Sequence, residues 1–307
     1  MKISIITVTL NSDKTLRDTL NSVLSQGYKN IEHIIVDGGS QDQTKAILKR
    51  YPNKNKKIYT LKGSGIYAAI NYGIKKSKGN FITILNSDDI YQSEKTISNI
   101  VKKIKRNKKI KIFFGDVAYF EKLDYYNVKR FFSSNRFKHY KMKFGLMPPH
   151  PGSFVKKDIY QKNELYKEDF QIASDFEFFL RNIYINKIKY KSFKETVVRM
   201  RLGGISSKNF FSYIISTKEI WRSFKLNNLN VSLFALIFRF LWKINQLFFY
   251  DTKKINKEFQ IFKVFFDKEQ LFINNFNLID DFNKIPFKKN FILSAMNLAF
   301  LGYFAAG

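Results

Sequence analysis

Short apolar runs alternate with stretches of helical pattern through the first hundred residues, and this alternation limits the fold more than any other feature. The runs are rich in β-branched residues and span 2–10, 31–39, 58–61 and 81–86. The first helix follows Asn11 or Ser12, either of which can cap it. Further helical stretches span 42–51 and 65–76. Because near-continuous apolar runs are typical of strands buried on both faces, the pattern predicts an α/β fold with a mostly parallel sheet flanked by helices.

The pattern changes after Lys111. Two runs there, KIFFGDVAYF and YYNVKRFF, predict a hairpin, and a Pro-rich loop follows at 146–154. We then expect a helix over 173–185 and a further strand that ends near Met200. The Gly pair in RLGGISS is the best domain boundary, because the sequence beyond it is helical and aromatic. The predicted domains are therefore residues 1–205 and a helical region over 206–307.

The apolar segment 231–250 is long enough to suggest a membrane-spanning helix, but it contains Arg239 and Lys243. On a helix these two side chains share a narrow polar stripe with Ser232 and Gln246. Such a helix can lie in a membrane interface, or it can pack on the first domain with the stripe facing outward. The sequence leaves both interpretations open.

Charge and cysteine content narrow the class of protein. The chain has 54 Lys and Arg against 25 Asp and Glu, a net charge of +29, and no Cys. A chain this basic attracts polyanions such as phosphorylated small molecules, anionic lipid surfaces or nucleic acid. Its most basic stretch, 102–143, is either a solvated face or a contact surface. Because the N-terminus is interpreted as a first strand and not as a signal peptide, we expect a cytoplasmic protein.

Three acidic residues follow strands of the predicted sheet: Asp37 after the second run, and Asp88 with Asp89 after the run 81–86. Ligands bind at this carboxyl edge in open α/β sheets, although a single such residue is more often a helix cap or turn residue. The sequence has no P-loop, no GxGxxG loop and no HExxH pair, which argues against ordinary ATPase, NAD-binding and zinc-hydrolase functions.

Carboxylates at this edge suit a hard cation. Mg²⁺ and Mn²⁺ take oxygen ligands, usually one or two carboxylates together with substrate phosphates, so Asp88 and Asp89 are the predicted metal ligands. A separate carboxylate is then needed to deprotonate a nucleophile. Asp175, at the start of the predicted helix 173–185, is the candidate general base.

Five ordered blocks of the sequence resemble the family-2 inverting glycosyltransferases of the GT-A fold, which build bacterial polysaccharides and lipid-linked glycans. The blocks are SIITVTLNS, EHIIVDGGSQDQT, SGIYAAINYGIKKSKGNFITILNSDD, HPGSFVKKDIY with FQIASDFEFFLR, and RLGGISS. The resemblance covers about residues 2–205 and rests on all five blocks occurring in order. It implies a Rossmann-like sheet, a nucleotide-sugar donor, a Mn²⁺ or Mg²⁺ cofactor, and transfer of a sugar with inversion at its anomeric carbon.

The resemblance also implies roles for single residues. Asn86, Ser87 and Asp88 occupy the family's Asp-x-Asp metal motif, with Asp88 as the metal ligand and Asp89 beside it. Asp175 matches the base that accepts the proton of the acceptor hydroxyl. Three residues match donor contacts, in the nucleotide pocket or to the base and ribose: Thr7, Asn11 and Asp37.

Five further residues have both a binding and a structural interpretation. His150, in the string PPHPG, can contact the diphosphate or the metal, or it can simply close the Pro-rich loop. Tyr67 and Asn71 lie four residues apart on a predicted helix near the pocket and are either ligand contacts or packing and cap groups. Arg199 and Arg201 can bind the diphosphate or remain solvated charges at a strand end.

Three features depart from the family pattern. Asn86 stands where the family often has Asp, and an amide can hydrogen-bond a ribose but adds no charge to a metal site. Ser64 and Ala68 stand where close relatives often have acidic residues. The QxxRW motif of processive members is absent, and the nearest string, EIWRS at 219–223, does not match. Transfer of one sugar per encounter is therefore expected.

These observations predict a metal-dependent, inverting, non-processive glycosyltransferase of cell-envelope polysaccharide biosynthesis. Its expected partners are a nucleotide-sugar, in particular a UDP-sugar, and a glycan or lipid-linked glycan acceptor, with no nucleic acid. We expect it to act at the inner face of the cytoplasmic membrane, with a possible anionic membrane surface as a further contact. The alternative is a noncatalytic protein that binds polyanions or nucleic acid on a degenerate nucleotide-sugar fold, an interpretation supported by the charge and by Asn86.

Overall fold

The computed structural model describes residues 1–121, 124–203 and 210–231, together with Leu236, Ile255 and Phe259. These residues all lie in the first of two compact units of the chain, Met1–Phe262. The predicted interfacial helix, with Arg239 and Lys243, lies outside the described residues apart from its first residue and Leu236. In the described part of the chain, no helix is both long and apolar enough to cross a membrane.

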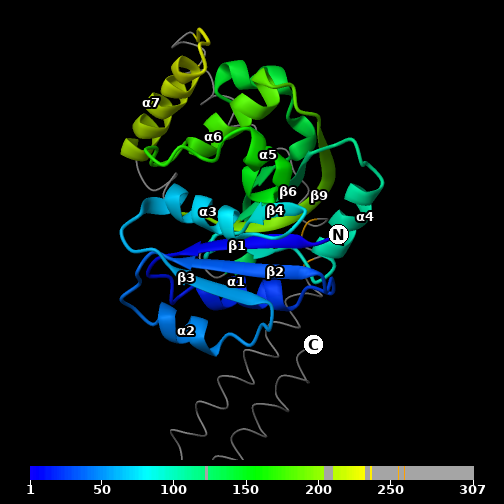
Figure 1. The fold of residues 1–307 in the computed structure, drawn as a ribbon, viewed down its shortest axis with the longest axis vertical. Helices are drawn as coiled ribbons and strands as arrows, with labels where there is room; N and C mark the ends of the chain where they lie inside the picture. The colour runs from blue at the N-terminus through cyan, green and yellow to red at the C-terminus, as the bar shows by residue number, and fades with distance from the viewer. Residues whose placement is uncertain (122–123, 204–209, 232–235, 237–254, 256–258, 260–307) are drawn as a thin grey trace, which may run out of the picture. The chain divides into compact units, whose positions relative to one another are not determined.

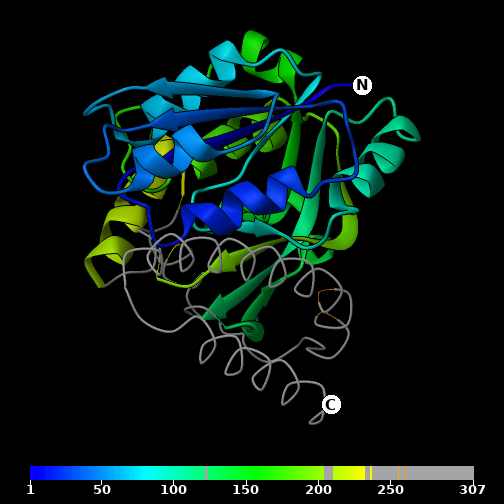
Figure 2. The ribbon, with the colours of Figure 1, turned by 90° about the horizontal axis from the view of Figure 1, so that it is seen from below.

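The first four strands are parallel, as the sequence predicts. They are β1 (Ile3–Thr9), β2 (Ile31–Asp37), β3 (Lys56–Thr60) and β4 (Phe81–Ile84), in the spatial order β3-β2-β1-β4. In Figures 1 and 2, α3 (Gly65–Lys76) covers one face of these strands. The helices α1 (Leu16–Leu24) and α2 (Thr44–Arg50) cover the other face. Within β2, Ile34 packs in the cluster that contains α3, and Ile35 packs in the cluster of α1 and α2. Burial on both faces explains why these runs are apolar throughout.

The rest of the sheet is mixed. From β4 the order continues as β8-β6-β9-β5, and β7 pairs with β6. These strands are β5 (Ile90–Tyr91), β6 (Ile112–Glu121), β7 (Asp124–Phe132), β8 (Ser153–Lys156) and β9 (Tyr190–Arg201). β6 and β9 are parallel, but β8 is antiparallel to both of its neighbours. The predicted hairpin is confirmed as β6 and β7. The expected parallel arrangement is confirmed for the first four strands and recurs between β6 and β9, whereas the pairings of β5, β7 and β8 are antiparallel.

The connection between β4 and β5 shows how strongly the sheet curls. Only residues 85–89 join these two strands, although three strands lie between them in the sheet order. Four strand spacings of about 4.8 Å amount to about 19 Å, close to the full reach of so short a segment. The segment is not extended, because the Asp89 amide donates to the Asn86 carbonyl at 3.1 Å. The sheet must therefore curl to bring β5 back toward β4.

Four helices complete the described fold. The sequence pattern missed α4 (Thr96–Lys105) and α5 (Lys157–Lys162), while α6 (Ser174–Phe179) lies where a helix is predicted and continues as a π-helical turn over Leu180–Ile185. The last, α7 (Phe210–Leu226), packs against α6, with the rings of Phe224 and Phe176 5.6 Å apart. Although α7 follows the predicted boundary at residue 205, it therefore packs directly on the part of the chain that carries the candidate site.

Candidate active site

The carboxyl ends of β1, β2 and β4 meet at one edge of the sheet, and side chains tie their loops together. The Ser12 hydroxyl lies 2.9 Å from the Ser87 hydroxyl, which joins the loop after β1 to the predicted metal motif. The Asn11 side-chain oxygen accepts the Gln41 amide at 2.9 Å, which joins the same loop to the one after β2. The structure thus brings Asn11 and Ser87 together at this edge, as the sequence predicts for parallel strands.

Asp37 organises the loop that follows β2. Its carboxylate accepts the Ser40 hydroxyl at 2.5 Å and the Ser40 amide at 3.1 and 3.2 Å, and the Ser40 hydroxyl accepts the Asn11 amide at 2.9 Å. Asn11 has a φ of 49°, a left-handed conformation that Asn adopts more readily than most residues. The predicted cap at Asn11 or Ser12 is wrong, because this turn delays the start of α1 to Leu16.

Thr7 lies inside the sheet and not at its edge. It is fully buried, and its hydroxyl lies 2.9 Å from Nε2 of His33, whose Nδ1 lies 3.1 Å from the Tyr51 hydroxyl. Burial lowers the pKa of His33 to about 3, so this histidine is neutral. Thr9, which pairs with Asp37 at the true end of β1, has a buried hydroxyl without a hydrogen-bond partner. Thr9 therefore lies nearer than Thr7 to the carboxyl edge of the sheet. The sequence predicted a strand over 2–10, but the resemblance assigned the donor contact to Thr7.

The predicted metal motif forms a tight turn after β4. The Asn86 side-chain amide donates to Oδ2 of Asp89 at 3.2 Å, and the Thr19 hydroxyl donates to the Asp89 carbonyl at 2.8 Å. Burial raises the pKa of Asp88, and burial together with the charge of Asp88 raises the pKa of Asp89. The charge of Arg201 acts in the opposite direction on both carboxyls.

These carboxylates fit a divalent cation. Oδ1 of Asp89 is buried and has no hydrogen-bond partner, and burial raises the pKa of both carboxyls, so a cation would stabilise their ionised forms. Within the described residues there is no cluster of three or more His, Cys, Asp or Glu side chains suited to a metal. A site for Mg²⁺ or Mn²⁺ at a phosphorylated substrate needs only one or two carboxylates, so Asp88 and Asp89 suffice.

Asp175 opens α6 and pairs with His150. Its side chain is 13% exposed, and Oδ2 lies 3.1 Å from Nδ1 of His150. Oδ1 accepts the Phe176 amide at 2.8 Å. Burial raises the pKa of Asp175, and the interaction with His150 lowers it. His150, predicted as a metal or diphosphate contact, is thus placed beside the candidate base, and we do not include it among the proposed metal ligands.

Tyr119 of β6 connects the two groups of carboxylates. Burial is the main cause that raises the pKa of its phenol; the Arg130 guanidinium lowers that pKa, and Asp89 and Asp175 both raise it. The guanidinium carbon of Arg130 lies 4.4 Å from the ring centre. The charges of Asp89 and Asp175 therefore both act on the phenol of Tyr119. No pattern in the sequence pointed to Tyr119, which lies near the end of the largely apolar strand β6.

Tyr67 and Asn71 of α3 hold the segment that leads to Asp175. The Tyr67 hydroxyl donates to the Ile172 carbonyl at 2.5 Å. The Asn71 side chain donates to the Tyr166 carbonyl at 2.8 Å and accepts the Tyr166 amide at 3.0 Å. Of the two interpretations open from sequence, these contacts favour the structural one for both residues.

Arg199 is fully buried, and its backbone pairs with Ile90, the residue that follows Asp89. Its guanidinium donates to the Gln92 side-chain oxygen at 2.9 Å, to the Ile255 carbonyl at 3.0 Å and to the Tyr125 carbonyl, and it lies 3.9 Å from the centre of the Phe259 ring. Burial lowers the pKa of Arg199 to about 10. These contacts favour a structural role, so we leave Arg199 out of the proposed donor site.

Arg201, two residues further along β9, is the arginine that reaches the edge. Its Nη2 lies 3.4 Å from Oδ2 of Asp18, which also accepts the Tyr125 hydroxyl. It also lowers the pKa values of Asp88 and Asp89. Arg201 therefore brings positive charge to the carboxylates, which suits contact with an anionic ligand.

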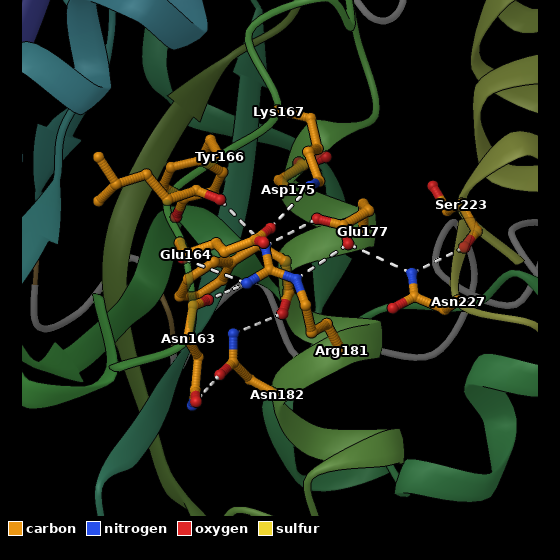
Figure 3. A network of polar contacts seen from close by, with 12 residues as sticks. Asn163, Glu164, Tyr166, Lys167, Asp175, Glu177, Arg181, Asn182, Ser223 and Asn227 are labelled. Atoms are coloured by element: carbon orange, nitrogen blue, oxygen red, sulfur yellow. Dashed lines mark hydrogen bonds and ion pairs between the residues drawn. The ribbon is translucent and has the colours of Figure 1, made fainter. Parts of the chain in front are cut away.

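A buried ion pair lies behind Asp175 (Figure 3). Glu177 accepts Nε and Nη2 of Arg181 at 3.0 and 2.9 Å, and the same guanidinium donates to the backbone carbonyls of residues 163–165. The Asn227 side-chain amide, which follows α7, donates to Glu177 at 3.2 Å. Removing one partner of such a buried pair costs about 3 to 5 kcal/mol because the other charge is left buried and unpaired. Replacing Glu177 or Arg181 alone should therefore destabilise the region around the helix that presents the base.

The model of glycosyl transferase family 2 matches residues 4–166, more than half of the sequence. The chain belongs to glycosyl transferase family 2. This glycosyltransferase is 27% identical over 233 residues to an uncharacterised glycosyltransferase of Rickettsia typhi. The aligned residues make up 72% of this chain and 71% of the relative. It is also 31% identical over 236 residues to the minor teichoic acid biosynthesis protein GgaB of Bacillus subtilis. That alignment covers 70% of this chain but only 25% of GgaB.

Solved structures confirm the GT-A type of fold for this glycosyltransferase. The structure of Staphylococcus aureus TarS in complex with UDP-GlcNAc superposes with a TM-score of 0.58 at 20% identity, covering 77% of this chain and 70% of the TarS chain. The mannosyltransferase PcManGT of Pyrobaculum calidifontis, in complex with GDP-Man and Mn²⁺, superposes with a TM-score of 0.55 at 15% identity, covering 76% and 68%. The family match includes Asp88 and Asp89 but ends before Asp175.

Proposed function

We propose that this glycosyltransferase is metal-dependent and inverting, and that it moves one sugar per encounter from a UDP-sugar to a glycan or lipid-linked glycan acceptor of the cell envelope. The observation that carries the proposal is the buried turn at the carboxyl edge of the sheet, where Oδ1 of Asp89 has no hydrogen-bond partner and the Ser12 hydroxyl lies 2.9 Å from the Ser87 hydroxyl. An unpartnered buried carboxylate oxygen at this edge supports a cation beside the donor, and the largely buried Asp175 at the start of α6 supports a separate general base.

Each carboxylate has its own task in this reaction. Asp88 and Asp89 would hold Mn²⁺ or Mg²⁺, which when bound neutralises the diphosphate as its bond to the sugar breaks. Asp175 accepts the proton of the acceptor hydroxyl while that oxygen attacks the anomeric carbon from the face opposite the diphosphate. Burial, which raises the pKa of Asp175, makes its carboxylate a stronger base than an exposed aspartate.

The names of similar proteins support a nucleotide-sugar donor and an envelope acceptor. TarS binds UDP-GlcNAc, PcManGT binds GDP-Man with Mn²⁺, and GgaB acts in teichoic acid biosynthesis. We carry over UDP because TarS gives the higher TM-score of these two structures. Membership in a family of transferases also favours the enzyme over the noncatalytic polyanion-binding alternative.

Thermal shift tests the donor. UDP-GlcNAc with Mn²⁺ is expected to raise the melting temperature by about 5 °C, since a ligand at a hundred times its Kd adds about 2.7 kcal/mol of stability. UDP-glucose and GDP-mannose serve as competing donors, and each nucleotide-sugar is repeated with EDTA in place of Mn²⁺. A rise in melting temperature with GDP-mannose and with neither UDP-sugar contradicts the UDP assignment. Rises that are equal with EDTA and with Mn²⁺ contradict the metal assignment.

We also propose that the enzyme works as a peripheral protein on an anionic membrane face. The support is its net charge of +29, since each Lys or Arg near an anionic surface contributes about 1 kcal/mol. The intact protein is expected to sediment with phosphatidylglycerol vesicles and not with phosphatidylcholine vesicles, and added salt should release it. Absence of binding to the anionic vesicles at low salt contradicts the membrane proposal without affecting the proposed chemistry.

A further inference from the structure

Helix α7 carries a buried carboxylate that binds the backbone just before the candidate base. Glu219 is 8% exposed. Its Oε1 accepts the amide of Gln171 at 2.6 Å, and its Oε2 accepts the amides of Ile172 and Ala173 at 2.9 and 2.8 Å. Hydrogen bonds from N–H groups to an ionised carboxylate are roughly twice as strong as neutral ones, so three of them on one side chain fix this backbone firmly.

The segment that Glu219 binds is held from its other side as well. Tyr67 of α3 donates its hydroxyl to the Ile172 carbonyl, so residue 172 has its amide bound by α7 and its carbonyl bound by α3. Asp175 follows only three residues later, as the second residue of α6. The direction in which α6 leaves the segment, and with it the position of the Asp175 carboxylate, follows from the orientation of these peptide groups.

The other contacts of α7 fall on α6 or on the side chains of residues 169 and 170. Arg222 pairs with Asp169, and its guanidinium carbon lies 4.9 Å from the centre of the Phe170 ring. Phe224 packs on Phe176, and Asn227 donates to Glu177. These contacts explain why α7 packs here, but none bears on the backbone of residues 171–173. A buried carboxylate is costly unless its hydrogen bonds are satisfied, and apolar contact alone would hold α7 without one. The three hydrogen bonds to Glu219 are therefore the contacts of α7 that hold the backbone of residues 171–173.

We propose that Glu219 is a positioning residue for Asp175, so that α7 belongs to the catalytic unit although it lies beyond the stretch that resembles the family. This inference rests on the proposed role of Asp175 as the general base. A displacement of about 1 Å in a reacting group can cost a hundredfold in rate, which is why the backbone ahead of the base matters for turnover.

Glu219→Gln tests the proposal with little change in shape. The side-chain NH₂ of the glutamine must face at least one of the three backbone N–H groups that Glu219 binds. Both groups are donors, so at least one of the three hydrogen bonds is lost. The assay uses the full chain with Mn²⁺ and follows release of UDP from UDP-GlcNAc, with water in place of the acceptor hydroxyl. We expect kcat to fall by about tenfold or more with the KM for UDP-GlcNAc unchanged, because Glu219 does not contact the donor edge.

Ser223→Ala is the matched control on the same helix. The buried Ser223 hydroxyl donates to the Glu219 carbonyl at 2.8 Å and makes no contact with residues 171–173. Its loss is expected to lower the melting temperature and to leave kcat unchanged. Glu219→Asp keeps the charge on a shorter side chain that reaches fewer amides, and we expect its kcat to lie between those of the wild type and Glu219→Gln.

The decisive measurement combines Glu219→Gln with Asp175→Asn. A residue that acts through Asp175 should cause no further loss of kcat once Asp175 is replaced, whereas an independent effect should appear equally in both backgrounds. The inference is overturned by an equal loss in both backgrounds, or by wild-type kcat in Glu219→Gln. If Glu219→Gln does not fold, wild-type kcat in Glu219→Asp overturns it. Wild-type turnover in Asp175→Asn alone instead refutes the proposed base.

Discussion

Asp88→Asn is expected to reduce sugar transfer at least about a thousandfold, because it removes one of the two carboxylates available to hold the cation that offsets the charge of the diphosphate. The affinity for UDP should fall mainly in the presence of Mn²⁺, where the lost ligand matters, and change little in EDTA. Isothermal titration with UDP in both buffers, together with the rate of UDP release from UDP-GlcNAc, measures both effects.

The same substitution should not destabilise the metal-free protein. Burial raises the pKa of Asp88, and the charge of Asp88 raises that of Asp89, so ionisation of this pair opposes folding as the pH rises through their folded pKa values. At neutral pH the neutral amide should therefore leave the melting temperature equal or higher. Asp158→Asn, which removes a carboxylate paired with Lys111 and Lys156 at the opposite edge of the sheet, should leave turnover intact. Near-normal turnover in Asp88→Asn contradicts the metal assignment.

Asp175→Asn is expected to lower kcat by about 10²- to 10⁴-fold and to keep donor affinity, since general base catalysis contributes this much and Asp175 belongs to the acceptor side of the proposed reaction. In the wild type, the acidic limb of the pH–rate profile should lie above the ordinary aspartate pKa of about 3.9, because burial raises the pKa of Asp175. The pH–rate profile of the residual activity of Asp175→Asn should not show this acidic limb.

Stability separates loss of the base from loss of the fold in this variant. A carboxyl whose folded pKa is raised costs stability as the pH rises through that pKa, so Asp175→Asn should melt at the same or a higher temperature at neutral pH. Glu164→Gln, which removes an exposed carboxylate paired with Lys167 on the same loop, is the matched control and should leave turnover unchanged. Equal losses of UDP affinity and turnover in Asp175→Asn would indicate misfolding and count against the base assignment.

The sequence was sufficient for the parts of the fold that depend on local pattern. Strands β1 to β4 lie within a few residues of their predicted runs, because burial on both faces requires continuous apolar sequence. β8 was not predicted, because its four residues are too short to show a period and are a strand only through pairing with β4 and β6. Its start at Ser153 lies within the segment predicted as a Pro-rich loop.

Side-chain environments in the site depended on contacts that no local pattern carries. Thr7 and Thr9 look alike in the sequence, and only the observed end of β1 shows which one lies at the edge. Arg199 and Arg201 alternate on one strand, yet one is buried among backbone carbonyls and the other faces carboxylates. Glu219 binds amides 46 to 48 residues away, a separation at which periodicity and motif spacing carry no information.

The short connection between β4 and β5 has a consequence for motion. Residues 85–89 are held by strand pairing at both ends. The turn within them is closed by the hydrogen bond from the Asp89 amide to the Asn86 carbonyl and tied to α1 by the Thr19 hydroxyl, so this segment is not free to open or close. Asp88 and Asp89 therefore behave as part of the rigid sheet, although they sit in a loop. Any rearrangement that admits the donor or releases the nucleotide must come from segments with spare length, and the carboxylates remain a fixed point against which those segments move.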